Sequence, residues 1–134
     1  MSMVKDIADL IADGGYGTVT TNIFCADLPD TPDTLAAVFE YAGSQPLLGE
    51  TLDQPGCQIR VRSMVYETAR TLLQNIQNLL IRIGDTNDAT YFDGVTLNGK
   101  DYIRIVPAQG INDIGKDSKG RTELTQNFYV IKRR

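Results

Sequence analysis

The chain has 134 residues, of which 42% are hydrophobic and 22% are charged, and its net charge is −4. This length suits one domain whose core needs neither disulfides nor metals, so we expect a single domain over residues 1–134. The sequence contains no histidine and only two cysteines. These counts exclude a Ser-His-Asp triad, a histidine general base and the common zinc sites. No cofactor is implied by the sequence. Lysine or carboxylate catalysis stays open.

No apolar stretch approaches the roughly 20 residues of a membrane span. The first residues also make a poor signal peptide, because Asp6, Asp9 and Asp13 interrupt their apolar positions. We therefore expect a soluble protein that stays inside the cell that makes it. In that reducing compartment Cys25 and Cys57 are expected to be free thiols.

Charge is distributed unevenly along the chain. Residues 1–57 hold nine acidic side chains and one basic one, whereas residues 58–134 hold eight acidic and twelve basic ones. The two parts carry −8 and +4. An assembling protein could use this polarity to bring an acidic surface of one copy against a basic surface of the next. The net acidity argues against sequence-specific nucleic-acid binding.

The N-terminal half predicts a helix over residues 3–12, which Gly14 and Gly15 end. Thr, Val and Ile favour a strand over residues 18–24, and Val and aromatic residues favour another over 35–41. Two longer loops are predicted around prolines, at 28–34 and 43–56.

The first of these loops carries Asp30 and Asp33, shortly after Asp27. Three neighbouring carboxylates could form a metal or acid-base cluster. Aspartate beside proline is better explained as turn chemistry, so we expect turns here.

Residues 57–63 alternate in polarity, with Cys57, Ile59 and Val61 on one face of a predicted strand. Arg60 and Arg62 lie on the other face, which is therefore expected to be basic. In a monomer this face would simply be solvated. In an assembly it could meet the acidic part of a neighbouring copy.

The C-terminal half predicts a long amphipathic helix over residues 66–83, capped by Gly84. An Asn98–Gly99 turn then joins two strands, 90–97 and 100–106, into a long β-hairpin. A final strand is predicted over 122–132. The expected fold is α+β: a mixed, mostly antiparallel sheet packed against one long amphipathic helix and a short N-terminal helix.

The polar, glycine-rich segment 110–121 matches neither a phosphate-binding loop nor a calcium loop. It is expected to be mobile, either as a flexible hairpin tip or as an arm that orders on assembly. We favour the arm, because a loop of this length is unusual in a compact domain.

Several ordered features together resemble a known family. They are the segments GTVTTNIF, LPDTPD, FEYAG, PGCQIRVRS, YETA and GKDSKGRTELTQNFYVIKR, which extend over nearly the whole chain. The combination is similar to the minor capsid or tail-terminator family of long-tailed bacteriophages and prophages.

The resemblance implies a structural, non-enzymatic virion protein at the head–tail junction, assembled in the host cytoplasm. Family members cap the head-proximal end of the tail tube as a ring, usually of six copies. They stop tube growth and present a docking surface to the head. The implied partners are further copies of the chain, the tail tube protein and a head-completion or connector protein.

Three alternatives remain at this point. The chain could be a head-completion or connector protein of the same junction, a small cytosolic adaptor domain, or an enzyme that uses lysine or carboxylate chemistry. For the ring, the residues expected at a subunit or partner interface come from the strand face at 60–62 and from the arm. They are Arg60, Arg62, Asn112, Asp113, Lys116, Asp117, Lys119 and Arg121.

Overall fold

The computed structural model describes all residues except 1, 45–50 and 134, and it describes no side chains within 42–50. The first element is helix α1, Met3–Asp13. The side chain of Ser2 accepts a hydrogen bond from the Lys5 N–H at its start, and Gly14 caps its end. The predicted N-terminal helix is confirmed.

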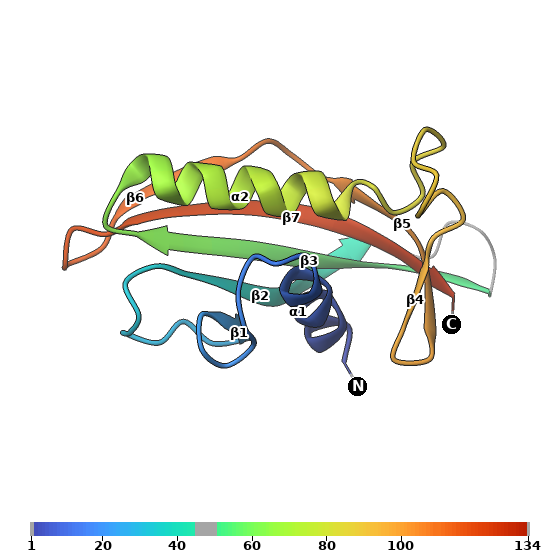
Figure 1. Cartoon of the computed structure of the whole chain (residues 1–134), viewed down its shortest axis with the longest axis horizontal. Helices are drawn as coiled ribbons and strands as arrows, with labels where there is room; N and C mark the ends of the chain where they lie inside the picture. The colour runs from blue at the N-terminus through green and yellow to red at the C-terminus, as the bar shows by residue number, and fades with distance from the viewer. Residues whose placement is uncertain (1, 45–50, 134) are drawn as a thin grey trace.

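Seven strands form one sheet (Figure 1). Their order across the sheet is β1-β2-β3-β7-β5-β4, and β6 also pairs with β7. Among these strands of the described residues, β1 and β2 pair in parallel and the other pairs are antiparallel. The strands are β1 Ile23–Cys25, β2 Leu35–Ser44, β3 Leu52–Ser63, β4 Val95–Leu97, β5 Lys100–Pro107, β6 Asn112–Lys116 and β7 Thr122–Arg133.

Helix α2, Tyr66–Leu80, lies along β3 and β7 (Figure 1). Its buried residues include Ala69, Leu73 and Ile76, which recur at helical spacing. They form one hydrophobic core with the buried face of α1 and with alternate residues of β3, such as Cys57 and Ile59. The predicted burial of the apolar faces of both helices and of β3 is confirmed, and the fold is α+β with a mixed sheet.

Three predicted boundaries differ from the structure. The strand expected over residues 18–24 is only Ile23–Cys25, because the chain before it makes turns. The helix expected to reach Ile83 ends at Leu80, and Ile83 is buried in the following turns. The prediction of a long hairpin is wrong, because β4 has only three residues and the chain from 86 to 94 forms turns.

The Asn98–Gly99 turn itself is confirmed: both residues have positive φ, of 50° and 80°, as a type I′ turn requires. The predicted loop over 43–56 is also shorter than expected, because β2 extends to Ser44 and β3 begins at Leu52. Residues 45–50 of that loop lie outside the described part of the chain.

Strands β5 and β6 lie one after the other along the same edge of β7. Residues 102–107 pair with 128–132, and 112–116 pair with 122–125. The segment expected to be mobile therefore contains a strand. Its tip is the turn between β6 and β7, at the end of the molecule where β3 passes into α2 (Figure 1).

Candidate interface surfaces

The two arginines expected on an open face of β3 differ in exposure: Arg62 is buried and Arg60 is half-buried. Arg62 is only 3% exposed. It donates hydrogen bonds to the carbonyl oxygens of Pro32, at 2.7 Å, and Asp33, at 3.4 Å. Burial, with the nearby Arg121 cation, lowers the pKa of Arg62. The loop 28–34 thus folds over the end of β3, and the expectation of a solvated Arg62 is wrong.

Arg60 is half-buried on the same face of β3. Its guanidinium lies 6.0 Å from the centre of the Phe39 ring and 3.6 Å from a carboxylate oxygen of Glu123. Both contacts lie within the chain, on the neighbouring strands β2 and β7. Arg60 is therefore engaged inside the sheet face, although part of its side chain stays accessible.

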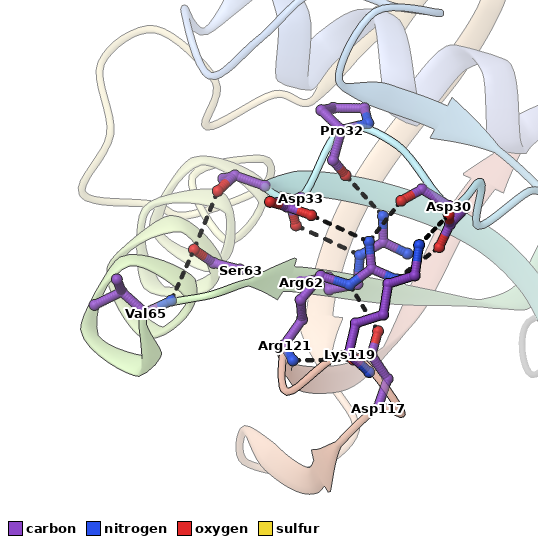
Figure 2. A network of polar contacts seen from close by, with 10 residues as sticks. Asp30, Pro32, Asp33, Arg62, Ser63, Val65, Asp117, Lys119 and Arg121 are labelled. Carbon is purple, nitrogen blue, oxygen red and sulfur yellow. Dashed lines mark hydrogen bonds and ion pairs between the residues drawn. The ribbon is translucent and has the colours of Figure 1, made fainter.

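Arg121, just before β7, is the centre of a polar cluster (Figure 2). Its side chain is 5% exposed and contacts carboxylate oxygens of Asp117 at 2.8 Å, Asp30 at 3.1 Å and Asp33 at 3.3 Å. It also donates to the Asp30 carbonyl oxygen. Lys119 makes a further ion pair with Asp30. We call Arg62, Arg121, Asp30, Asp33, Asp117 and Lys119 the Arg121 cluster.

Hydrogen bonds also order the turn between β6 and β7. The Asp117 carboxylate accepts from the backbone N–H groups of Lys119 and Arg121, both at 2.9 Å. The backbone hydrogen bond from Arg121 is the main reason that the pKa of Asp117 lies below its usual range, and the side-chain bond from Arg121 lowers it further. The pKa of Asp30 is lowered by its bonds to Lys119 and Arg121. The expectation of a mobile arm over 110–121 is therefore wrong.

The structure divides the predicted interface residues into two groups. Arg62 and Arg121 are buried, and Arg60 and Asp117 are half-buried, all with partners in the same chain. The exposed members lie on β6 and in the turn that follows it. They are Asn112, Asp113, Lys116 and Lys119.

The aspartates of the 28–34 loop were predicted to act only in turns, and their ion pairs with Arg121 were not predicted. Asp30 and Asp33 do lie in a loop, but they also pair with a cation about 90 residues away in sequence. No local pattern reports such a contact. Asp27 is exposed and takes no part in the cluster.

A second cluster joins the two halves of the chain around Asp6 in α1. Asp6 is 0% exposed and accepts hydrogen bonds from the Tyr102 hydroxyl and the Asn98 amide. Its carboxylate also lies 3.5 Å from the Lys100 ammonium. Burial, followed by the Asp6 hydrogen bond, raises the pKa of Tyr102. We call Asp6, Asn98, Lys100 and Tyr102 the Asp6 cluster.

These contacts explain the uneven charge of the sequence. Ion pairs between the two parts of the chain use the cations Lys100, Lys119, Arg121 and Lys132. Their partners in residues 1–57 are Asp6, Asp30, Asp33 and Asp53. Part of the charge polarity therefore stabilises the fold of one chain, which weakens it as an argument for contact between copies.

Exposed apolar side chains mark surfaces that the sequence did not reveal. Met64 and Val65 connect β3 to α2, and Tyr66 begins α2; each of the three is at least 44% exposed. Phe92, before β4, is 51% exposed, and Ile114 on β6 is 46% exposed. The sequence did hold a signal for Met64, Val65 and Tyr66. These apolar residues come after the alternating strand and before the apolar stripe of the helix, so neither pattern accounts for them.

The described residues offer little for catalysis. Among them no group of three or more Cys, Asp or Glu side chains could hold a metal ion, and no helix is long and apolar enough to cross a membrane. Cys25 and Cys57 are free, as expected. Burial raises the pKa of the Cys57 thiol to about 12, which makes it a poor nucleophile.

Comparisons with known proteins agree with a virion component. The sequence matches the family described as bacteriophage tail terminator protein over residues 10–134. A solved structure described as "Virion of native gene transfer agent (GTA) particle" contains a chain with the same fold. The TM-score is 0.64 and the identity 11%, with 99% of this chain and 96% of that chain covered. No curated protein sequence matches.

Because the family match extends over almost the entire chain, the protein belongs to the bacteriophage tail terminator protein family. It is thus a structural protein of phage tails. The resemblance noted from the sequence is confirmed.

Proposed function

We propose that this chain, as a one-domain subunit, forms a ring of six copies at the head-proximal end of a phage tail tube. The ring stops polymerisation of the tube and offers the surface to which the head docks. The family match over residues 10–134 carries this proposal. The similar chain belongs to the virion of a gene transfer agent particle, which supports a place among assembled tail components.

The fold supports a role in assembly more than one in catalysis. The described residues expose apolar side chains at the β3–α2 connection, before β4 and on β6. Strand β6 is exposed along all five of its residues and, within the described part of the chain, pairs with β7 alone. We assign its exposed residues Asn112, Asp113 and Lys116, with Lys119 in the next turn, to the surface that meets a neighbouring copy or the tail tube.

The partners in this proposal are further copies of the chain, the tail tube protein and a head-completion or connector protein. A tail terminator acts at the junction between head and tail. The family match favours this assignment over a connector of the same junction.

Native mass spectrometry of the purified chain tests the ring directly. Six copies of 14.8 kDa give about 89 kDa. Electron micrographs of the same sample should show rings with a central hole. A mass of 14.8 kDa at every concentration, with no rings on added tail tubes, would contradict the proposal.

A further inference from the structure

A closed ring needs two different surfaces on each copy, one that matches the other on the next copy. The charge polarity of the sequence is a weak source for this pair, because four of its cations already make ion pairs between the two parts of the chain. The pair must come from what the folded chain leaves exposed. Two surfaces with exposed apolar side chains meet this condition and lie toward opposite ends of the molecule (Figure 1).

The first surface is the apolar knob, which we define as Met64, Val65 and Tyr66. These side chains are 51%, 56% and 44% exposed. The Val65 N–H donates to the Ser63 hydroxyl at 3.3 Å, and that hydroxyl lies 3.1 Å from the hydroxyl of Thr34 (Figure 2). The knob is therefore held in place by the end of β3, beside the Arg121 cluster, and does not need to order on binding.

A cation flanks the knob. Lys116 pairs with Thr122, which pairs on its other side with Ser63, the residue before Met64. Two strand spacings, about 10 Å, separate Lys116 from Ser63. Lys116 is exposed and makes no ion pair within the described residues.

The second surface is the β4 hollow, of about 520 Å³, which opens beside the last strand of the sheet. Its lining includes the exposed Phe92, Val95 and two acidic side chains, Asp93 and Asp101. Arg133 also lines it, at 4.0 Å from Asp101. Asp93 is exposed and makes no ion pair within the described residues.

The shape of the hollow depends on Gly94. This residue has φ of +89°, and a Cβ there would lie 2.2 Å from the carbonyl oxygen of Tyr102. Only glycine lets the chain pass this close to β5 before it turns into β4. The hollow is thus built by the backbone, next to Phe92 and Asp93.

We propose that the apolar knob of one copy packs into the β4 hollow of the next, with Lys116 of the first copy facing Asp93 of the second. The two surfaces match at two points: the apolar side chains of the knob meet Phe92 and Val95 in the lining of the hollow, and a cation meets a carboxylate, neither of which has an ion pair among the described residues. They lie toward opposite ends of the molecule, so the contact is head to tail, and it closes a ring when the rotations between successive copies add up to a full turn. This inference rests on the proposed ring.

Complementary variants test the contact. Met64→Ser with Val65→Ser removes the knob, and Phe92→Ser removes the apolar wall of the hollow; all three side chains are exposed, so the fold should persist. Each variant should need roughly tenfold more protein to assemble, or fail to assemble. In a mixture of the two variants, the intact knob of one can still pack into the intact hollow of the other. The mixture should therefore give species of two chains that grow no further.

A charge exchange tests the pairing of Lys116 with Asp93. Lys116→Asp and Asp93→Lys should each weaken assembly, and the double variant should recover it. Arg104→Asp is the matched control, because Arg104 is exposed on β5, makes no ion pair within the described residues and belongs to neither surface. Circular dichroism checks the folding of each variant.

The outcomes separate this contact from the ring itself. Wild-type rings together with unchanged rings in the knob and hollow variants would overturn the contact and leave the proposed function standing. A mixture that yields no two-chain species would also overturn the contact. A wild type that neither forms rings nor limits tube growth would overturn the proposed function as well.

Discussion

The Arg121 cluster and the Asp6 cluster perform the same task with opposite chemistry. Each joins the N-terminal half of the chain to the C-terminal half, one at the β6–β7 turn and one at the β4–β5 turn. The first has a buried cation whose partners in the N-terminal half, Asp30 and Asp33, are each 62% exposed. The second has a carboxylate that is 0% exposed, held mainly by neutral donors.

The difference predicts how each cluster fails. A buried polar or charged group that loses its partner keeps the full cost of desolvation. An exposed group that loses its partner can bond to water instead. Damage to the Asp6 cluster should therefore cost more than damage to the Arg121 cluster. It should also depend less on salt, because exposed charges are screened.

The largest effect is expected for Asp6→Ala. It leaves the Tyr102 hydroxyl and the Asn98 amide without their acceptor, and we expect a loss of about 3 kcal/mol in the free energy of unfolding. Urea unfolding measures it. Asp13→Ala, on the exposed end of the same helix, is the control and should change stability by less than about 0.5 kcal/mol. Equal losses in both variants would refute the role of Asp6.

A smaller effect is expected for Arg121→Met. This change keeps most of the buried stem but removes the cation that holds Asp30, Asp33 and Asp117 together. The melting temperature should fall, by less than in Asp6→Ala, and salt at about 1 M should reduce the difference from wild type. A loss larger than that of Asp6→Ala would reverse the ranking of the two clusters.

Acid should weaken the Arg121 cluster. The pKa values of Asp30 and Asp117 are lowered in the folded state, so their contribution is complete above the unfolded value of about 3.9 and is lost as pH falls below it. The gap in melting temperature between wild type and Arg121→Met should narrow below about pH 4. A gap that stays constant down to about pH 2 would contradict this assignment.

Base should weaken the Asp6 cluster. The pKa of Tyr102 is raised, so its contribution is complete below the unfolded value of about 10 and is lost as pH rises above it. The stability gap between wild type and Tyr102→Phe should narrow above about pH 10. The Cys57 thiol, whose pKa of about 12 exceeds the unfolded value, also makes the folded state less stable in alkali. Because Cys57 is present in both proteins, its effect cancels from the difference in stability between them.

The smallest effect is expected for Lys119→Ala. Lys119 and Asp30 are both more than half exposed, and exposed ion pairs contribute little. Thermal unfolding should not change measurably. A clear fall would mean that the Arg121 cluster depends on its exposed rim as well as on the buried arginine.

The difference between local signals and long-range contacts explains which parts of the structure the sequence could predict. Helix α2 and the Asn98–Gly99 turn were predicted because their signals, helical spacing and a two-residue turn, are local. Strand β6 was missed because Asn-Asp-Ile-Gly-Lys does not alternate between apolar and polar residues. Its pairing depends on β7 and includes an irregularity between Asp113 and Gly115.

The site was predicted less well than the fold. Arg62 has the alternation of a solvent-facing residue, yet carbonyl groups of a loop about 30 residues earlier cover it. The charge polarity was visible in the sequence, but whether it acts within a chain or between chains depends on long-range contacts. The exposed knob at Met64–Tyr66 became apparent only once both flanking elements had their bounds.

Tube elongation is the most direct test of the proposed role. Tail tube protein is allowed to polymerise, the chain is added during growth, and tube length is followed by electron microscopy. We expect elongation to stop soon after the addition, with a ring at one end of each tube. Tubes that continue to lengthen at an unchanged rate, with both ends bare, would contradict the assignment of this chain as the protein that ends the tail.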